Sequence, residues 1–352
     1  MEQPGNMTDQ PEWQPQPEQH QPEQPQQEAA PGFQQRSDLT ALNNAVTAIE
    51  NEVSKVIVGQ KEMVELLIAG ILSNGHILIE GVPGVAKTLT AKLIARSLDV
   101  PFSRIQFTPD LMPSDVTGTP VFNPKNSEFE FRKGPIFSNI VLIDEINRAP
   151  AKTQSALFEV MEERQVTSDG TTHRLEAPFM VVATQNPIEH EGTYRLPEAQ
   201  LDRFLFKINV PYPTAAEEVK ILEGHNNLGT STHVDKIERV LNAGQIVELQ
   251  QKIRDIHAEE KLLVYIARIV SDTRVNKSLF LGASPRASIG ILNASKAIAA
   301  MRGRDFITPD DVKFVVTPVL RHRLVLTPDK EMEGITTDEV IAQIVKNIEI
   351  PR

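Results

Sequence analysis

Glu80-Gly81-Val82-Pro83-Gly84-Val85-Ala86-Lys87-Thr88 is the stretch around which this sequence is organised. It follows His76-Ile77-Leu78-Ile79, which is typical of a short buried strand, and it precedes residues 89–98, whose apolar spacing is helical. A strand, a glycine-containing loop, Lys-Thr and a helix form the context of a phosphate-binding loop. Backbone N–H groups of such a loop hold phosphate oxygens, and the helix N-terminus adds a positive dipole end. We therefore expect a nucleotide to be bound by Gly81, Val82, Pro83, Gly84, Val85, Ala86, Lys87, Thr88 and Leu89.

Two side chains of this loop have specific expected tasks. Lys87 would reach the β- and γ-phosphates, and Thr88 would place its hydroxyl on Mg²⁺. One position departs from the usual pattern G-x-x-x-x-G-K-[ST], because Ala86 stands where glycine is usual. Alanine fits there if the residue has near-helical φ and ψ, but not if φ must be positive. The alternative to phosphate binding is an ordinary strand-to-helix turn.

Length and composition narrow the class of protein. The 352 residues suffice for two modest domains and a tail, and the absence of cysteine excludes disulfides and Cys-based metal sites. A formal charge of −11 argues against a surface that coats nucleic acid, although it leaves room for a local basic channel. Neither an apolar run of about 18 residues nor a secretory signal is found. We expect a cytoplasmic protein without membrane insertion.

The order of elements predicts an α/β fold followed by a helical domain. Residues 1–36 are rich in Pro, Gln and Glu and are expected to be a disordered tail. The core, at 37–212, has five predicted strands for a parallel sheet, at 76–79, 102–107, 139–143, 179–183 and 205–210. The strands are expected to stop beyond Pro213, and residues 213–352 are predicted to be helical, near 214–225, 243–257, 260–275, 285–302, 309–321 and 337–348.

Two segments of the core are predicted to be inserted hairpins. Residues 108–138 are rich in turn residues and contain a short alternating piece at Phe129-Glu130-Phe131. Residues 165–175 carry Asp169-Gly170 between two strand-like runs, which is a strong hairpin signal.

Polar residues follow two of the predicted strands. Asp144 and Glu145 end an apolar strand, at the sheet edge where open α/β sheets bind ligands. Asp144 would hold Mg²⁺ through its waters, and Glu145 would act as general base on the attacking water. Asn186 would lie on the neighbouring strand beside the γ-phosphate. The alternatives are a helix-start acidic pair without a catalytic role and a turn-forming Asn before Pro187.

Several motifs together are similar to those of one family. GVPGVAKT at 81–88, LIDEINRAP at 142–150, ATQNP at 183–187, LPEAQLDRF at 196–204 and GASPRA at 282–287 resemble the MoxR family of AAA+ ATPases. The resemblance covers about residues 37–330, and alanine at position 86 resembles a variant seen within the family. It implies an AAA+ core with a helix-2 insert at 108–138, a pre-sensor-1 hairpin at 165–175 and a helical lid.

The resemblance also implies roles for individual residues. Arg203 matches the arginine finger, which reaches the γ-phosphate of the neighbouring subunit. Arg286 matches sensor 2 and would contact the γ-phosphate in cis. Val58, Gly59 and Gln60 lie where such proteins meet the adenine. Three further residues are weaker candidates: Gln106 for restraining Glu145, and Arg148 and Arg195 for the subunit interface.

The expected function is Mg²⁺-dependent ATP hydrolysis by a homo-oligomeric ring, a hexamer by resemblance. MoxR proteins act as chaperones that mature or assemble other proteins, with von Willebrand A domain proteins as usual partners. One alternative is a motor acting on nucleic acid, for which Arg174 is a thin basis and the acidic balance unfavourable. Another is a nucleotide-switched scaffold with little turnover. The preference for ATP over GTP rests on the resemblance.

Overall fold

The computed structural model describes residues 38–187, 193–194, 196–228 and 237–351. The tail predicted at residues 1–36 lies outside this part of the chain, and so does Arg195. Within the described residues, none of the helices has both the length and the apolar character that a membrane crossing requires.

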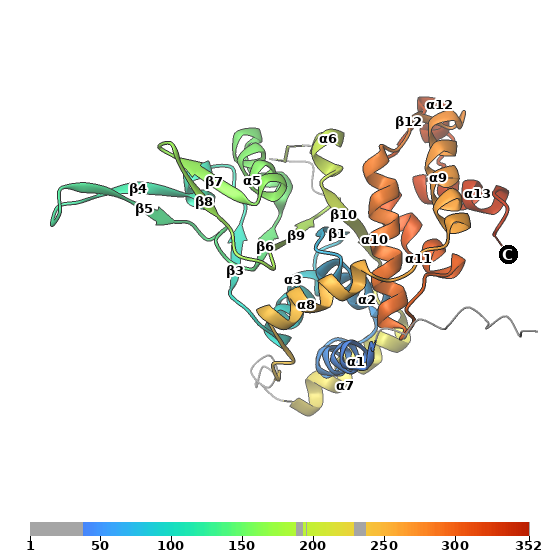
Figure 1. The fold of residues 1–352 in the computed structure, drawn as a ribbon, viewed down its shortest axis with the longest axis horizontal. Helices are drawn as coiled ribbons and strands as arrows, with labels where there is room; N and C mark the ends of the chain where they lie inside the picture. Colours follow the sequence, from blue (N-terminus) through green and yellow to red (C-terminus); the bar gives the residue numbers. More distant parts are fainter. Residues whose placement is uncertain (1–37, 188–192, 195, 229–236, 352) are drawn as a thin grey trace, which may run out of the picture. The chain divides into compact units, whose positions relative to one another are not determined.

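A five-stranded parallel sheet forms the centre of the core (Figure 1). Its strands run in the order β10-β1-β9-β6-β3, and every neighbouring pair is parallel. The prediction of the fold class is confirmed. The strands are β1 (His76–Gly81), β3 (Phe102–Gln106), β6 (Ile140–Asp144), β9 (Met180–Gln185) and β10 (Phe204–Val210).

Successive strand residues enter two separate apolar clusters, one on each face of the sheet. Ile77 and Ile79 pack with α1, α2 and α3, whereas Leu78 packs with α5. Because both faces of a parallel sheet are covered, its strands are apolar throughout, and β6 is buried at every position. The helices are α1 (Thr40–Ser54), α2 (Lys61–Leu72), α3 (Lys87–Ser97) and α5 (Ala151–Glu163).

Both predicted inserts are antiparallel hairpins, and Figure 1 shows β4 and β5 extending away from the sheet. Phe131 of the first hairpin stacks on His173 of the second, with 4.2 Å between ring centroids, so the two inserts contact each other. The helix α4, which precedes the first hairpin, was not predicted. The elements are α4 (Pro113–Thr117), β4 (Gly118–Asn123), β5 (Glu128–Lys133), β7 (Gln165–Ser168) and β8 (Thr171–Arg174).

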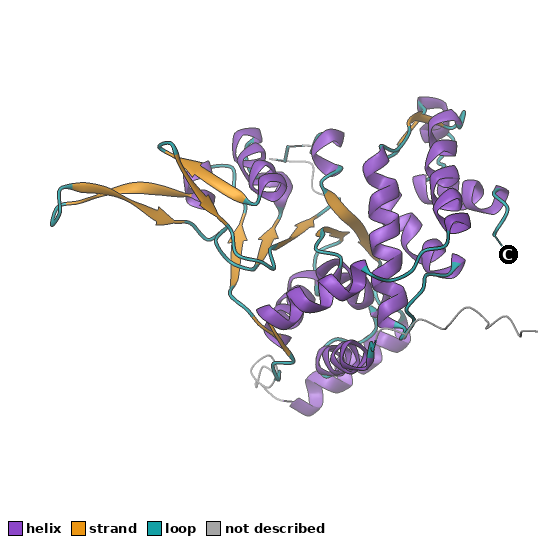
Figure 2. Cartoon of the chain, in the orientation of Figure 1, coloured by secondary structure: helices purple, strands orange, loops and turns teal. Residues whose placement is uncertain are grey.

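The C-terminal part is mainly helical (Figure 2). Its helices are α7 (Ala215–Leu228), α8 (Ala243–Arg254), α9 (Glu260–Val275), α10 (Pro285–Met301), α11 (Pro309–Leu320), α12 (Pro328–Met332) and α13 (Thr337–Asn347). The expectation that strands stop beyond Pro213 is wrong. Runs of two or three residues are too short to leave a periodic signal. The additional pairs are β2 (Leu98–Asp99) with β11 (Leu241–Asn242), and β12 (Leu279–Leu281) with β13 (Val325–Leu326).

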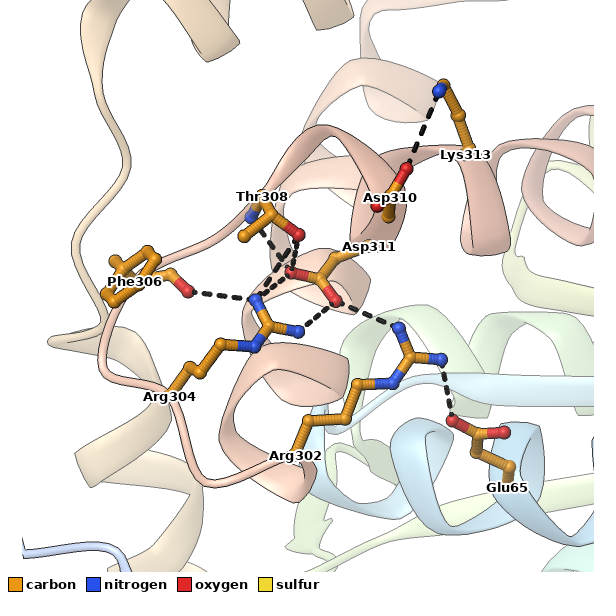
Figure 3. Close-up of polar contacts among 8 residues, drawn as sticks. All are labelled: Glu65, Arg302, Arg304, Phe306, Thr308, Asp310, Asp311 and Lys313. Carbon is orange, nitrogen blue, oxygen red and sulfur yellow. Dashed lines mark hydrogen bonds and ion pairs between the residues drawn. The ribbon is translucent and has the colours of Figure 1, made fainter.

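A polar cluster fastens the helical part to α2 of the core (Figure 3). Asp311, in the first turn of α11, is fully buried and accepts two 2.6 Å hydrogen bonds from Arg304. The backbone N–H of Thr308 also donates to Asp311, at 2.8 Å, which forms one half of a capping box at the start of α11. Arg302 bridges Asp311 and Glu65 of α2, at 3.1 Å to each. Two arginines therefore compensate one buried carboxylate.

Candidate nucleotide site

The phosphate-binding loop connects β1 to α3, and its backbone passes through the left-handed region. Gly84 has φ of 87°, and Ala86, which caps α3, has φ of 58° and ψ of 22°. The near-helical geometry that would suit alanine is thus not formed, because the chain must turn here from the loop into the helix. The carbonyl of Ala86 accepts hydrogen bonds from the Thr90 N–H (2.9 Å) and hydroxyl (3.0 Å), which hold this conformation.

Lys87 folds back over the loop. Its Nζ donates to the carbonyl oxygens of Gly81 and Val82. Burial lowers the pKa of Lys87, against the opposing effects of Asp144 and Glu145. The cationic group therefore lies among acceptors that a phosphate would replace.

Asp144 collects three donors at the end of β6. Its Oδ1 accepts from the hydroxyls of Thr88 (2.7 Å) and Thr184 (3.1 Å), and its Oδ2 accepts from Arg104 Nε (2.6 Å). The residue is only 4% exposed. A carboxylate oxygen and a hydroxyl oxygen side by side are the hard ligands that Mg²⁺ prefers, so Thr88 and Asp144 fit this ion.

Glu145 follows Asp144 with φ of 58°, which turns its side chain out of the strand. Its Oε2 accepts a 2.8 Å hydrogen bond from Gln106 Nε2 and lies 3.0 Å from Arg148 Nε. Its backbone N–H donates to the Thr184 hydroxyl at 3.1 Å. The carboxylate is thus restrained by Gln106 and Arg148, two of the three residues that were weaker candidates from the sequence.

A pocket of about 740 Å³ lies over the loop and the ends of β3, β6 and β9. Its size is that of a small-molecule site. Most of the predicted site residues line it: Pro83, Gly84, Val85, Ala86, Lys87, Thr88, Leu89, Asp144, Glu145 and Asn186. Residues that were not predicted to belong to the site, or were left open, also line it: Lys92, Phe102, Arg104, Gln106, Thr184 and Gln185.

Arg104 and Thr184 are the most important of these additions, because both bind Asp144. A signal for Arg104 was available. It stands two residues before Gln106 on one strand, so both side chains point to the same face of the sheet.

The predicted adenine-contacting residues, Val58, Gly59 and Gln60, do not line this pocket. Gln60 instead contacts the loop itself, since its Nε2 donates a 2.6 Å hydrogen bond to the carbonyl of Val85. The side chain of Glu217, on α7, occupies the space beside Gly59.

Arg203 and Arg286 lie together, apart from the pocket lining. Arg286 donates a 2.7 Å hydrogen bond to Glu162 Oε1, and Arg203 Nε lies 3.4 Å from Glu162 Oε2. The implied contact of Arg286 with the γ-phosphate in cis stays a prediction; in this structure Arg286, at the start of α10, bonds to Glu162 near the end of α5 and is not among the residues that line the pocket. We call Arg203 and Arg286 the arginine pair.

Comparison with known proteins agrees with this arrangement. Residues 76–206 match the ATPase family associated with various cellular activities, and residues 271–344 match the AAA lid domain. Chaperone MoxR1 of Mycobacterium tuberculosis is 45% identical over 93% of this chain and 88% of its own length. YeaC of Bacillus subtilis is 45% identical over 86% of this chain and 94% of its own length.

Among solved structures, a candidate ATPase from Cytophaga hutchinsonii is similar, with a TM-score of 0.82 at 41% identity. The match covers 89% of this chain and 97% of that one. Core and lid are thus matched in sequence and in structure, and the relatives align over nearly their whole lengths. The chain belongs to the MoxR family of AAA+ ATPases.

Proposed function

We propose that this chain hydrolyses ATP in a Mg²⁺-dependent reaction, as a ring of identical subunits in the cytoplasm. The observation that carries the proposal is the contact of Thr88 with Asp144 beside Lys87 and Glu145, within one pocket. In this proposal residues 37–212 bind the nucleotide, residues 213–352 form the lid, and the tail at 1–36 takes no part in catalysis.

Each pocket residue has a task in the reaction. Thr88 and Asp144 would hold Mg²⁺, which offsets charge on the β- and γ-phosphates. Lys87 exchanges the carbonyls of Gly81 and Val82 for phosphate oxygens. Glu145 takes the proton of the attacking water once Gln106 releases its carboxylate, and Asn186 orients that water. Val58, Gly59 and Gln60 would meet the adenine, as the family resemblance implies, and Gln60 also supports the loop through its hydrogen bond to the Val85 carbonyl.

Ring formation is supported by the location of the arginine pair. A γ-phosphate needs positive charge in the transition state, and supplying it in trans is a common solution. Since neither arginine lines the pocket of its own chain, a neighbouring subunit would complete the site. We take the ring to be a hexamer, as the family resemblance implies.

The proposed role is that of a chaperone that remodels, matures or assembles partner proteins. It rests on the family and on the similarity to the chaperone MoxR1. By the same resemblance, the partners would include proteins with von Willebrand A domains.

Phosphate release tests the enzymatic part of the proposal. Lys87→Ala and Glu145→Gln should each lower kcat at least a hundredfold. Each removes an interaction that stabilises the transition state, and the loss of one such interaction lowers kcat by a factor on the order of 10²–10³. Glu145→Gln should retain ATP binding, whereas Lys87→Ala should weaken it. Unchanged hydrolysis by Lys87→Ala would show that the site is wrongly assigned.

Affinity capture with Glu145→Gln tests the chaperone part. With ATP present, this variant should retain a protein with a von Willebrand A domain, and the same lysate without ATP should not yield it. Nuclease treatment should leave the capture unchanged. Recovery that depends on nucleic acid would instead favour a motor acting on DNA or RNA.

A further inference from the structure

Glu162, near the end of α5, contacts both members of the arginine pair. Its two oxygens are divided between them, Oε1 at 2.7 Å from Arg286 and Oε2 at 3.4 Å from Arg203. The Arg203 guanidinium also lies 5.9 Å from the ring centre of Phe158, one turn earlier on the same helix. A single helix therefore sets the position of two cations that come from the core and from the lid.

The charges make this arrangement more than a surface ion pair. Two guanidiniums that approach each other repel, and one carboxylate between them removes the repulsion. The cluster still carries a net positive charge of one. An exposed salt bridge contributes little to the free energy of unfolding. Here, however, the Glu162 carboxylate offsets the repulsion between the guanidinium groups of Arg203 and Arg286 and so allows them to lie close together.

The backbones that carry the two arginines are also fastened to each other. Asp202, which precedes Arg203, accepts a 2.7 Å hydrogen bond from the buried Arg323. Its other oxygen accepts a 3.1 Å bond from the hydroxyl of Ser284, the residue that caps α10 two positions before Arg286. The bonds of Asp202 thus connect the backbone segments that carry the two arginines, while Glu162 contacts their guanidinium groups.

We infer that Glu162 is a positioning residue: it keeps Arg203 and Arg286 together as one cationic site for the terminal phosphate of a nucleotide bound by a second copy of this chain. The inference deepens the proposed function and rests on it. The phosphate carries more negative charge than the carboxylate, and it has oxygens enough for both guanidiniums. Glu162 therefore preorganises the pair and yields to the phosphate on assembly.

Steady-state kinetics of Glu162 variants give the first test. Glu162→Ala should lower kcat about tenfold. The guanidinium groups of Arg203 and Arg286 would still be present, but they would no longer be held in position for the phosphate, and poor positioning lowers the rate. The KM for ATP should stay within about twofold, because Lys87 and the loop bind the nucleotide on another face. Glu162→Asp should restore part of the rate. The matched control is Glu163→Ala, since Glu163 forms no ion pair within the described chain.

Mixed assemblies separate an effect in trans from a merely structural one. Lys87→Ala has a defective pocket but an intact arginine pair, whereas Glu162→Ala has an intact pocket and a disturbed pair. An equimolar mixture should hydrolyse ATP faster than the sum of the two variants alone. A Lys87→Ala/Glu162→Ala double variant mixed with Glu162→Ala should show no such excess.

A parallel mixture of Lys87→Ala with Arg203→Ala distinguishes a failure of the role inferred for Glu162 from a failure of the proposed ring. If this mixture exceeds its sum and the Glu162→Ala mixture does not, the role of Glu162 is refuted while the shared site stands. If neither mixture exceeds its sum, the ring part of the proposed function fails, and the inference fails with it. A Glu162→Ala chain with wild-type or higher kcat would also overturn the inference.

Discussion

Thr88 Oγ1 donates a 2.7 Å hydrogen bond to Asp144 Oδ1, which joins the first turn of α3 to the end of β6 across 56 positions of sequence. Both residues line the pocket that Lys87 also lines. A Mg²⁺ ion takes carboxylate and hydroxyl oxygens together with nucleotide phosphates. The pair is therefore the feature on which metal dependence should rest.

Thr88→Val keeps the shape of the side chain and removes its hydroxyl. We expect the Mg²⁺ concentration for half-maximal hydrolysis to rise about tenfold, since one of the ion's ligands is lost. Thr88→Ser retains the hydroxyl and should behave like the wild type. The measurement is a titration of phosphate release with Mg²⁺ at saturating ATP. Equal metal requirements of Thr88→Val and Thr88→Ser would remove Thr88 from the metal site.

Gln106 offers a second test, because its amide holds Glu145 at 2.8 Å. A general base that is hydrogen-bonded elsewhere is not free to accept a proton from water. Gln106→Ala should raise hydrolysis in the absence of a client about fivefold, the effect of losing a hydrogen bond of about 1 kcal/mol. A lower rate would mean that Gln106 orients Glu145 productively.

Ala86 permits a prediction about stability, since its φ of 58° lies where alanine is disfavoured. The left-handed conformation costs an L-residue about 1–2 kcal/mol, and glycine avoids this cost but loses more chain entropy. Ala86→Gly should therefore raise the free energy of unfolding by about 0.5–1 kcal/mol, with ATP binding unchanged. Urea denaturation of the two proteins would measure it. A destabilised glycine variant would show that the methyl group contributes more through packing than it costs in strain.

The sequence predicted the parts of this site that depend on local pattern. Lys87, Thr88, Asp144 and Glu145 belong to short segments whose strand and loop context can be recognised residue by residue. Arg104 and Thr184 were missed, because they meet Asp144 only through the order β9-β6-β3. The spacing to Gln106 indicates the face on which Arg104 lies, but it does not show that β3 lies beside β6, which is a property of the folded sheet.

In the lid, too, the local elements were predicted from the sequence, but their packing was not. Its main helices were predicted from apolar periodicity, and their bounds in the structure agree within a few residues. The location of Arg286 beside Glu162 was not predicted, because it depends on where the folded chain places the start of α10 and not on the motif around it. The short strands β11, β12 and β13 beyond Pro213, and β2 that pairs with β11, were missed since they contain too few residues for alternation to be recognised.

His76 makes stability depend on pH. Its Nε2 donates to the carbonyl of Met161, and its Nδ1 accepts from the N–H of Val181, each at 3.0 Å. The bond from Val181 requires the neutral ring, because a protonated Nδ1 could not accept it, whereas Nε2 can donate to Met161 in either state. Burial lowers the pKa of His76 to about 4, although the bond to Met161 opposes this. The unfolded chain binds a proton near pH 6.5 and the folded chain does not, so stability is lost as the pH falls from about 6.5 toward 4.

From pH 7 to pH 5, this residue should cost about 2 kcal/mol of the free energy of unfolding. His76→Gln can form similar bonds without titrating, so its loss over the same range should be smaller by that amount. His225→Gln is the control, since His225 is exposed. Denaturant unfolding at the two pH values gives the comparison. Equal losses in wild type and His76→Gln would show that the ring is not kept neutral.

Asp311 stabilises the attachment of the lid to the core. Burial raises its pKa, but the hydrogen bonds from Arg304 and Thr308 outweigh burial and leave the pKa below its ordinary value. The carboxylate therefore contributes stability that is present above about pH 4 and is lost as the pH falls through the lowered pKa. At neutral pH the charge is fully formed and compensates Arg302 and Arg304.

Asp311→Asn should lower the free energy of unfolding by about 3 kcal/mol at pH 7, because two arginines lose their buried counter-charge. Asp310→Asn is the matched control: Asp310 is 83% exposed and lies 3.5 Å from Lys313, so its removal should cost no more than about 0.5 kcal/mol. Urea unfolding followed by circular dichroism measures both. The difference should shrink as the pH falls below 4, since wild-type Asp311 then loses its charge as well. A pH-independent difference would mean that Asp311 acts through helix capping and not through its charge.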